Sequence, residues 1–386
     1  MEFEFTDEQR AFYDQVYRFS REQLLPKSEE NDLNSYFDRE SFRKMGEFGL
    51  LGLHFPEEYG GAGSDVVTAC LAGEATGHAA VDGGLTLAWG AHTYLCGDTI
   101  LCHGTEEQKK KYLPKLASGE WVGCMGLTEP NAGSDVAGLS TTAVKKGDRY
   151  VLNGSKIFIT NGPAAEVAVV YATLDKGKKH GGISAFIVDK DTPGYTPGKP
   201  LKKMCVKSSA TSELFFEDCE IPEENLLGKE GNGFFMALQT LEWDRSALLS
   251  PFVGALRFGV EECMRYAKAR AQFGRPIASF QAIQHKIARM KIISEASRNL
   301  LYRIACSKDA GNPVNHLLAA VAKLWVSEFG MEVAHQGVQV HGGYGLMHEY
   351  PVERMFRDTR LGSIGGGTSE IQKTIISRFF LTGGEK

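Results

Sequence analysis

The sequence predicts an α+β protein whose helices and strands occupy separate parts of the chain. Apolar residues recur at helical spacing up to about residue 120 and again from residue 232 onward. Between these parts the pattern changes to short runs rich in β-branched and aromatic residues. We found no internal repeat and no low-complexity linker. We therefore expect an N-terminal all-α domain (1–121), a middle antiparallel β domain (122–231) and a C-terminal α-helical domain (232–386).

The N-terminal part opens with a helix signal. Thr6 and Gln9 have the spacing of a capping box, and Phe12, Val16 and Phe19 follow on one helical face. Further helical stretches continue to about residue 120. A cluster of Pro and Gly in residues 56–63 predicts a loop between them.

The middle part carries several strand signals. Asn153-Gly154 lies between two apolar runs, which is a strong hairpin signal. The expected strands are residues 150–152, 156–160, 167–172, 183–188 and 213–216. The sequence lacks both a strand–GxGxxG–helix unit and a Walker lysine loop. These absences argue against a Rossmann or P-loop fold.

The C-terminal part contains three long helical runs, residues 235–270, 284–307 and 317–338. Pro251 lies inside the first run, and a proline in a helix interior kinks or ends the helix. We expect the first run to be interrupted there.

Composition narrows the functional classes. The net charge of −5 offers no basic surface for nucleic acid, and no run of about 18 apolar residues predicts a membrane span. The first residues lack the pattern of a secretory signal. The eight cysteines are scattered without a CxxC pair, so we expect reduced thiols and a cytoplasmic protein that binds neither nucleic acid nor membrane.

Six glycine-rich or polar segments resemble those of one enzyme family. Near the C-terminus lie residues 364–372, with 339–345 and 350–358 before them; the others are 126–136, 156–162 and 270–281. Together they resemble the acyl-CoA dehydrogenase family over nearly the whole chain. The resemblance implies that family's fold: an N-terminal helical domain, a middle antiparallel β domain and a C-terminal four-helix bundle. It also implies an FAD enzyme of fatty-acid metabolism that forms a homotetramer or at least a dimer.

The resemblance places one set of flavin contacts in and beside the β domain. Hydroxyl and backbone groups would hold the flavin, and small residues would let the diphosphate approach; the residues concerned are Leu127, Thr128, Gly133 and Ser134. Phe158 would pack on the isoalloxazine ring and Thr160 would bond its N5. The two side chains lie on one side of a strand by its period of two. Taken alone, these segments also fit a polar surface turn and ordinary core packing.

A second set of flavin contacts is implied in the C-terminal part. Arg270 suits a diphosphate because its guanidinium makes charge-assisted, bidentate bonds. In the family this segment reaches the FAD of a neighbouring subunit. The residues of the set are Arg270, Gln272, Phe273, Gln281, Gln339, Gly342, Gly343, Thr368 and Glu370. A solvated arginine at a helix end is the ordinary alternative for Arg270.

The expected catalytic carboxylate is missing from its commonest place. Many family members carry a Glu directly before the Gly-Thr pair, and this chain has Gly366 there. The isovaleryl and long-chain branches place the carboxylate on a helix before an Arg, which here is Asp244 before Arg245. An Asp is shorter than a Glu by one carbon, about 1.5 Å. The Gly366 N–H would still serve as a donor to the thioester oxygen.

Asp244 has three interpretations. It is the base, or a structural partner of Arg245 or solvated helix residue, or part of a site where the usual α proton is not taken. The resemblance also implies that Ser134, His92, Arg245 and Gly367 contact substrate. His92 and Cys96 are one helical turn apart but have no third ligand at usable spacing, so we expect no metal site.

The leading hypothesis is an FAD-dependent α,β-dehydrogenase of an acyl-CoA that passes electrons to an electron-transferring flavoprotein. Residues 201–209 and the missing Glu also resemble dehydrogenases of carrier-protein-bound acyl or aminoacyl thioesters. A phosphopantetheine-linked substrate is therefore a second hypothesis, since CoA ends in the same arm. A third is an offshoot with altered elimination, such as 1,4-dehydrogenation of a cyclic enoyl-CoA or desulfination. A flavin- or thioester-binding protein without dehydrogenation is a fourth.

Overall fold

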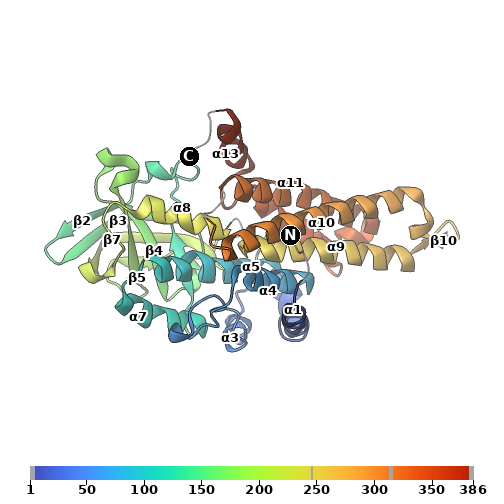
Figure 1. Cartoon of the computed structure of the whole chain (residues 1–386), viewed down its shortest axis with the longest axis horizontal. Coiled ribbons are helices and arrows are strands. Elements are labelled where there is room, and N and C mark those ends of the chain that lie inside the picture. The colour runs from blue at the N-terminus through green and yellow to red at the C-terminus, as the bar shows by residue number, and fades with distance from the viewer. Residues whose placement is uncertain (1–4, 245–246, 313–315, 382–386) are drawn as a thin grey trace.

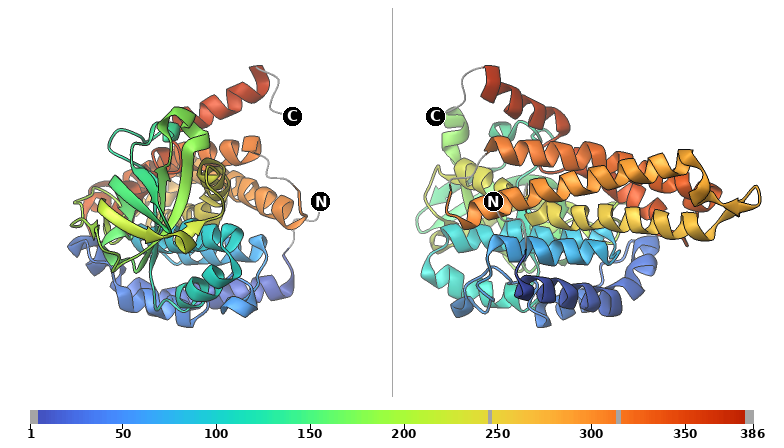
Figure 2. Two further views of the ribbon diagram at one scale, coloured as in Figure 1. Left: turned by 90° about the vertical axis from the view of Figure 1, so that its left-hand side faces the viewer. Right: turned by 45° about the vertical axis from the view of Figure 1, so that its right-hand side comes forward.

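The computed structural model describes residues 5–244, 247–312 and 316–381, and the three-part order of the elements is as the sequence predicts. The β domain forms one end of the molecule, and long helices of the C-terminal part extend away from it (Figure 1). The N-terminal helices lie along one side of both (Figure 2). The element type changes between α7 (Glu106–Ala117) and β1 (Gly123–Gly126) and again between β8 (Leu226–Leu227) and α8 (Gly233–Asp244). These changes support the domain limits 1–121, 122–231 and 232–386, which we propose for this chain.

Over residues 5–121, the N-terminal part contains seven α-helices: α1 (Asp7–Phe19), α2 (Leu25–Asn34), α3 (Arg39–Glu47), α4 (Val66–His78), α5 (Gly83–Gly90), α6 (Asp98–His103) and α7 (Glu106–Ala117). Shorter helical segments join them: η1 (Ser20–Leu24), η2 (Glu57–Tyr59) and η3 (Ala91–Gly97). The predicted capping box opens α1, because the Gln9 N–H donates to Oγ1 of Thr6 and the Thr6 N–H to Oε1 of Gln9. Helix α4 is almost wholly buried and packs against both α1 and α9.

The middle part is one eight-stranded sheet in the order β6-β7-β3-β2-β4-β5-β8, with β1 beside β4. The strands are β1 (Gly123–Gly126), β2 (Thr142–Lys146), β3 (Arg149–Thr160), β4 (Val167–Thr173), β5 (Ile183–Asp189), β6 (Tyr195–Pro197), β7 (Thr211–Pro222) and β8 (Leu226–Leu227). Short helical turns η4 (Val136–Gly138), η5 (Gly162–Ala164), η6 (Lys176–Gly182) and η7 (Glu223–Asn225) connect them. Pairing is mainly antiparallel, as predicted. The β1–β4 pairing and one β2–β4 residue pair are parallel.

The predicted hairpin at Asn153-Gly154 is wrong. Both residues lie inside the continuous strand β3, where the register against β7 shifts between Leu152 and Gly154. Gly154 has φ 144°, and a glycine inside a strand commonly marks such a bulge. The hairpin turn lies upstream: β2 and β3 pair through the two intervening residues Gly147 and Asp148, and Gly147 has φ 61°.

The C-terminal part contains α8 (Gly233–Asp244), α9 (Ser250–Ala269), α10 (Gln281–Asp309), α11 (His316–His341), α12 (Pro351–Thr359) and α13 (Ser369–Leu381). A small hairpin joins β9 (Ala271–Gln272) to β10 (Arg275–Pro276), and the short helical segments are η8 (Ala247–Leu249), η9 (Ile277–Ser279), η10 (Gly342–Leu346) and η11 (Arg360–Ser363). Pro251 lies in the first turn of α9, where its missing N–H costs no helical bond. This position explains why the predicted run is interrupted.

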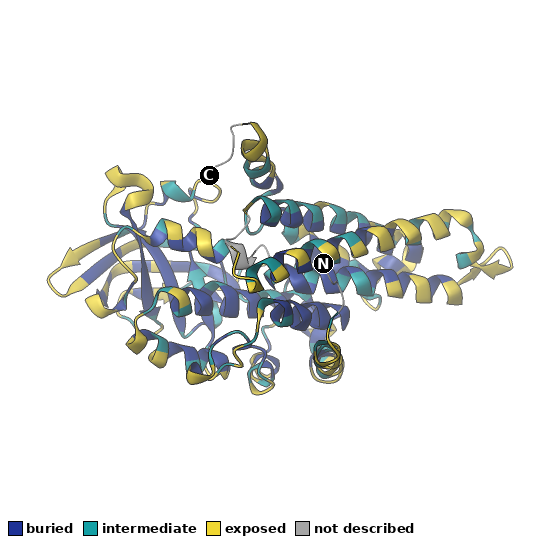
Figure 3. Ribbon diagram, viewed as in Figure 1, coloured by how far each residue is buried: buried dark blue, intermediate teal, exposed yellow. Residues whose placement is uncertain are grey.

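Helices α9, α10 and α11 pack side by side, and their far end carries the β9–β10 hairpin (Figure 1). Helix α13 projects from the body, and much of its surface is exposed (Figure 3). All eight cysteines are unpaired thiols. Within the described ranges, no helix has both the length and the apolar character needed to cross a membrane.

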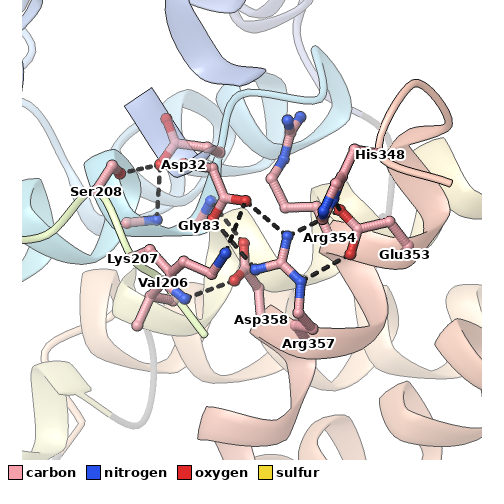
Figure 4. Close-up of polar contacts among 12 residues, drawn as sticks. Asp32, Gly83, Val206, Lys207, Ser208, His348, Glu353, Arg354, Arg357 and Asp358 are labelled. Carbon is pink, nitrogen blue, oxygen red and sulfur yellow. Dashed lines mark hydrogen bonds and ion pairs between the residues drawn. The ribbon is translucent and has the colours of Figure 1, made fainter. Parts of the chain in front are cut away.

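Helix α12 joins the three parts of the chain through ionic contacts (Figure 4). The Asp358 carboxylate accepts hydrogen bonds from the N–H groups of Val206 (2.6 Å) and Gly83 (3.1 Å). The Arg357 guanidinium donates to the Asp32 carboxylate at 2.6 Å. Because Asp358 is mostly buried, these bonds fix the C-terminal end of α12 against the N-terminal and middle parts. The loop that follows α12 therefore starts from a fixed point.

Candidate active site

The flavin contacts predicted from the sequence lie in three places on the molecule. The first group lies on and beside strand β3 in the β domain, and the second lies around the β9–β10 hairpin at the far end of the helices (Figure 1). Thr368 and Glu370 lie in a third place, at the start of α13.

Phe158 is an exposed aromatic ring on a bulged strand. The register between β3 and β7 shifts between Lys156 and Ile159, and Phe158 has φ 60°, which is unusual for an aromatic residue. The residue is 66% exposed, its neighbour Ile159 is buried, and Thr160 is half-buried. Phe158 and Thr160 are thus the more accessible residues, although a bulge separates this segment from regular pleating. An accessible ring on a fixed backbone offers a flat wall to a ligand.

The loop after β1 lies beside this bulge. The Ile157 N–H donates to the carbonyl oxygen of Thr128 at 2.9 Å, which holds the loop against β3. Leu127 is buried, Thr128 is half-buried, and Gly133 and Ser134 are exposed. A Cβ added at Gly133 would meet nothing within 4 Å, so the surface there is open.

A buried ion pair supports both segments. The Lys156 Nζ lies 2.6 Å from Oε1 of Glu129, and the side chains are 0% and 1% exposed. Glu129 also accepts hydrogen bonds from the Ser140 hydroxyl and the Thr141 N–H. Burial favours the neutral acid, but the Lys156 ammonium and these donors lower the pKa of Glu129 to about 2. Glu129 is therefore a fixed anion that holds its neighbourhood in place.

Asn161 anchors the end of β3 to the rest of the protein. It has φ 68°, and its amide Nδ2 donates to the carbonyl oxygens of Ala88 (2.8 Å) and Gly123 (3.1 Å). Its Oδ1 is buried and has no partner within the described structure. This contact joins the strand that carries Phe158 to α5 and to β1.

The second group meets at a cavity of about 470 Å³. Four of the predicted flavin contacts line it: Arg270, Gln272, Gly342 and Gly343. A Cβ added at Gly342 or Gly343 would meet nothing within 4 Å, so backbone is open to a ligand there. The Arg270 guanidinium lies 5.4 Å from the centre of the Tyr344 ring. An arginine beside open backbone amides suits a diphosphate.

The remaining members of the second group lie outside that cavity lining. Phe273, at the tip of the hairpin, is 91% exposed with φ 52°. Gln281 and Gln339 are exposed at the start of α10 and near the end of α11. Phe273 is therefore a large apolar side chain that the described chain leaves almost fully open to solvent.

The loop before α13 presents backbone. Gly366 and Gly367 have φ 64° and 93°, conformations that residues with a Cβ rarely adopt. Thr368 caps α13, since its Oγ1 accepts from the Ile371 N–H at 3.3 Å. Glu370 is exposed in the first turn of α13. Because Gly366 has no side chain, this loop supplies no carboxylate at that position.

Helix α8 ends at Asp244, but the Asp244 side chain and the whole of Arg245 lie outside the described residues. One turn earlier, the buried Thr240 hydroxyl lies 2.8 Å from that of Thr99. The contact ties α8 to α6, just after the π-helical segment η3. Such π-helical turns often occur near functional sites.

His92 has a structural position. The ring is fully buried, its Nε2 donates to the carbonyl oxygen of Leu116 (3.0 Å), and its Nδ1 accepts from the Gly123 N–H (2.9 Å). Burial lowers the pKa of His92 to about 4. Both ring nitrogens are therefore occupied, so the proposal below does not include His92 among the substrate contacts. Within the described ranges, no group of His, Cys, Asp or Glu is placed to hold a metal.

The residue types in these groups, taken together, fit a flavin dinucleotide by their chemistry, although the groups lie apart within one chain. Phe158 provides an exposed ring, the loop around Thr128 provides hydroxyl and backbone groups, and Arg270 provides a cation beside open backbone. An aromatic wall, hydrogen-bonding groups and a diphosphate site are what an isoalloxazine with a diphosphate tail requires.

Three family models match the chain in order: the N-terminal (residues 6–120), middle (124–219) and C-terminal (231–381) domains of acyl-CoA dehydrogenase. The chain belongs to the acyl-CoA dehydrogenase family. Membership confirms the three-part fold, the oxidoreductase class and the FAD cofactor that the sequence predicts.

The chain is similar along its whole length to family members of differing substrate. It is 44% identical to the short-chain-specific acyl-CoA dehydrogenase of Clostridium acetobutylicum over 98% of this chain and 99% of the relative. The butyryl-CoA dehydrogenase structure of Megasphaera elsdenii matches with a TM-score of 0.95 and 41% identity, over 99% and 100% of the two chains. A prolyl acyl carrier protein oxidase structure matches with a TM-score of 0.95 and 36% identity, over 98% and 100%.

Several polar residues near these sites were not singled out from the sequence: Glu129, Lys156, Asn161, Lys323 and Gln372. Lys323 had a usable signal, because it is a lone lysine in the apolar run of residues 319–326. Its structural contacts involve the loop before α13 and are described below. The pair of Glu129 and Lys156 had no such signal, since 27 residues separate them along the chain.

Proposed function

We propose that this chain removes hydrogen from C2 and C3 of an acyl thioester, with the Asp244 carboxylate as base and the Gly366 N–H as a donor to the thioester oxygen. The proposal rests on one observation above the others. Position 366 is a glycine in a left-handed conformation, so it offers backbone and no carboxylate. A base is still required, because the C2 proton of a thioester is weakly acidic.

Asp244 is the candidate that remains from the family's second arrangement, and it ends the helix α8. A carboxylate there would take the C2 proton, and donors at the thioester oxygen would stabilise the charge that develops. Bound FAD supplies the two-electron oxidant. Phe158 and the loop around Thr128 would orient the flavin, and Ser134 and Gly367 would contact the thioester. Arg245 would follow the base in sequence, as in the family arrangement.

We propose further that two copies of this chain complete each flavin site. The contacts on β3 and the contacts around Arg270 lie at opposite ends of the molecule (Figure 1), and the family resemblance has the Arg270 segment reach the FAD of a neighbouring subunit. The almost fully exposed Phe273 supports a second subunit covering this tip. A dimer, or a tetramer built from dimers, brings the two groups together.

The test of Asp244 is an anaerobic titration of the purified protein with saturated, branched, cyclic and unsaturated acyl-CoA thioesters, followed at the flavin absorbance band. The wild-type chain should be bleached by at least one saturated thioester. Asp244→Asn should keep its flavin and lose the bleaching. Glu242→Gln is the matched control, because it makes the same acid-to-amide change two positions earlier in the sequence. Full activity of Asp244→Asn would remove Asp244 from the base position.

A carrier-bound substrate is the second candidate, and the likeness to the prolyl acyl carrier protein oxidase supports it. The same titration with acyl or prolyl groups on a phosphopantetheine carrier protein distinguishes the two. Bleaching by carrier-bound groups alone would favour this candidate. Reaction of unsaturated or sulfinyl thioesters alone would favour altered elimination. We propose an electron-transferring flavoprotein as the acceptor of the electrons, testable by its reduction during turnover.

A further inference from the structure

The loop before α13 contains three glycines in succession, Gly365, Gly366 and Gly367. Glycines lose more conformational freedom on ordering than any other residues. Gly366 and Gly367 both have positive φ, and neither residue has a side chain that could restrict its backbone. Whatever orders this loop must therefore act on its backbone.

The first such contact comes from Lys323 on α11. Its Nζ donates to the carbonyl oxygen of Gly367 at 2.6 Å, and the residue is only 2% exposed. A lysine is almost never fully buried unless its charge is compensated. A hydrogen bond from an ammonium is stronger than one between neutral groups, so this contact is a firm hold on the Gly367 peptide.

The second contact comes from Gln372 on α13. Its Nε2 donates to the carbonyl oxygens of both Gly366 and Gly367, each at 3.2 Å, and the residue is fully buried. Gln372 thus forms hydrogen bonds with the loop that precedes its own helix, α13. Lys323 contacts the same loop from α11. The Gly367 carbonyl receives both donors, and the Gly366 carbonyl receives one.

We infer that Lys323 and Gln372 are positioning residues for the reaction, which fix the Gly366–Gly367 backbone so that the Gly366 N–H keeps its direction toward the thioester oxygen. This inference rests on the proposed function, in which Gly366 is that donor. With its C-terminal peptides held, the Gly366 residue is restricted to one left-handed conformation. A preorganised donor stabilises developing charge without reorganisation during the reaction.

The family resemblance gives this clamp a particular importance here. Where many members carry a Glu, this chain has a glycine with a glycine on each side. The loop has therefore lost a side chain that would restrict its backbone, and three flexible residues stand where a donor must be aimed. Misplacing a reacting group by about 1 Å costs on the order of 100-fold in rate. The buried ammonium and amide provide the restriction that the glycines lack.

The variants Lys323→Met and Gln372→Met each remove the hydrogen-bond donors of one side chain and put an unbranched apolar side chain of similar length in its place. Ser327→Ala is the matched control. Ser327 lies one turn further along α11, is buried, and donates to the carbonyl oxygen of Gly362 at 2.8 Å, ahead of the loop. It removes a similar bond between α11 and the chain without touching residues 365–367.

Two measurements are made on the FAD-loaded proteins. Steady-state turnover uses the acyl-CoA that bleaches the wild-type flavin, and hydrogen exchange measures the amides of residues 364–368. Both methionine variants should lose roughly 10- to 100-fold in kcat with little change in KM, because the donor acts in the transition state. Their loop amides should exchange faster. The Ser327→Ala protein should keep kcat and its loop exchange rate.

Unfolding by urea separates these effects from general damage, since a variant that loses only stability keeps kcat in native conditions. Faster exchange with unchanged kcat would overturn the positioning role, and so would an equal loss of kcat in Ser327→Ala. Unchanged exchange would overturn the clamp itself. If no thioester reduces the flavin of the wild-type protein, the proposed function fails instead, and the exchange measurement still decides whether Lys323 and Gln372 order this loop.

Discussion

The Nζ of Lys156 lies 2.6 Å from Oε1 of Glu129, and neither side chain is accessible to solvent. Glu129 follows Thr128 directly, and Lys156 precedes Phe158 by two residues. The pair therefore joins the two segments of the β domain that we assign to the flavin. A buried charge is tolerated only when it is paired and hydrogen-bonded, and Glu129 has donors in addition to Lys156.

Replacing Lys156 alone should be strongly destabilising. Lys156→Met leaves the Glu129 carboxylate buried without its cation, and breaking such a pair costs about 3–5 kcal/mol. The loop around Thr128 should loosen, so the purified variant should retain less than the wild-type ratio of FAD to protein. Urea unfolding and the flavin absorbance measure the two effects.

The double variant Lys156→Met with Glu129→Gln is the control for this prediction. It removes the unpaired charge, so it should recover part of the lost stability. Equal stability of the single and double variants would mean that the ion pair does not hold this region together.

Phe158 provides a test of flavin binding that is separate from folding. Because the ring is 66% exposed, Phe158→Ala should change the free energy of unfolding by less than about 0.5 kcal/mol in the apoprotein. Loss of the aromatic wall should weaken FAD binding about tenfold. Val144→Ala, at an exposed position on the neighbouring strand β2, is the control and should leave FAD affinity unchanged. Unchanged FAD affinity in Phe158→Ala would show that Phe158 does not contact the flavin.

Local patterns predicted much of this architecture. The capping box of Thr6 and Gln9 and the order of helical and β parts follow from spacing and motif. The Asn153-Gly154 signal failed because a glycine inside a long strand serves a bulge as readily as a turn. From the sequence, Gly154 fits either a hairpin turn or a bulge inside a strand. The pairing of β3 with β7 shows that it lies in a bulge.

Contacts between distant residues could not be predicted in this way. Lys323 and Gly367 are 44 residues apart, and no periodicity relates a helix position to a loop carbonyl. For His92, the sequence instead suggested a substrate contact that its hydrogen bonds do not support. Its place on a helix near the expected acyl site suggested a substrate contact, but tertiary packing gives both its nitrogens to backbone groups. The sequence shows that a side chain can form hydrogen bonds, but it does not show which groups will be its partners.

His92 should make the protein sensitive to mild acid. Its pKa is lowered to about 4, from an ordinary value near 6.5, because burial disfavours the charged ring and Nδ1 already accepts a hydrogen bond. Between these values the unfolded chain binds a proton that the folded chain does not. Stability from this group is therefore complete above about pH 6.5 and is lost as pH falls toward 4.

Urea unfolding at pH 7 and pH 5 measures this effect. His92 should account for about 2 kcal/mol of the stability lost between the two values. His92→Gln keeps hydrogen-bonding atoms but does not titrate, so its loss over the same interval should be smaller by that amount. An identical pH dependence in the two proteins would show that His92 is not held neutral.

A catalytic carboxylate should function at either position 366 or position 244. If Asp244→Asn abolishes flavin reduction by the thioester, adding Gly366→Glu should restore part of it, because the family resemblance places the commonest catalytic Glu at this position. The left-handed conformation of Gly366 should cost the new side chain about 1–2 kcal/mol.

Restoration by the double variant should therefore be partial, at least about tenfold above Asp244→Asn alone in anaerobic flavin reduction. The companion double variant with Gly366→Gln has the same shape and the same backbone strain but no base, so it should restore nothing. Equal reduction by the Glu and Gln variants would show that a carboxylate at position 366 does not reach the proton. Recovery with Glu alone would show that one proton-abstracting carboxylate, supplied from either the loop or the helix, is what the reaction requires.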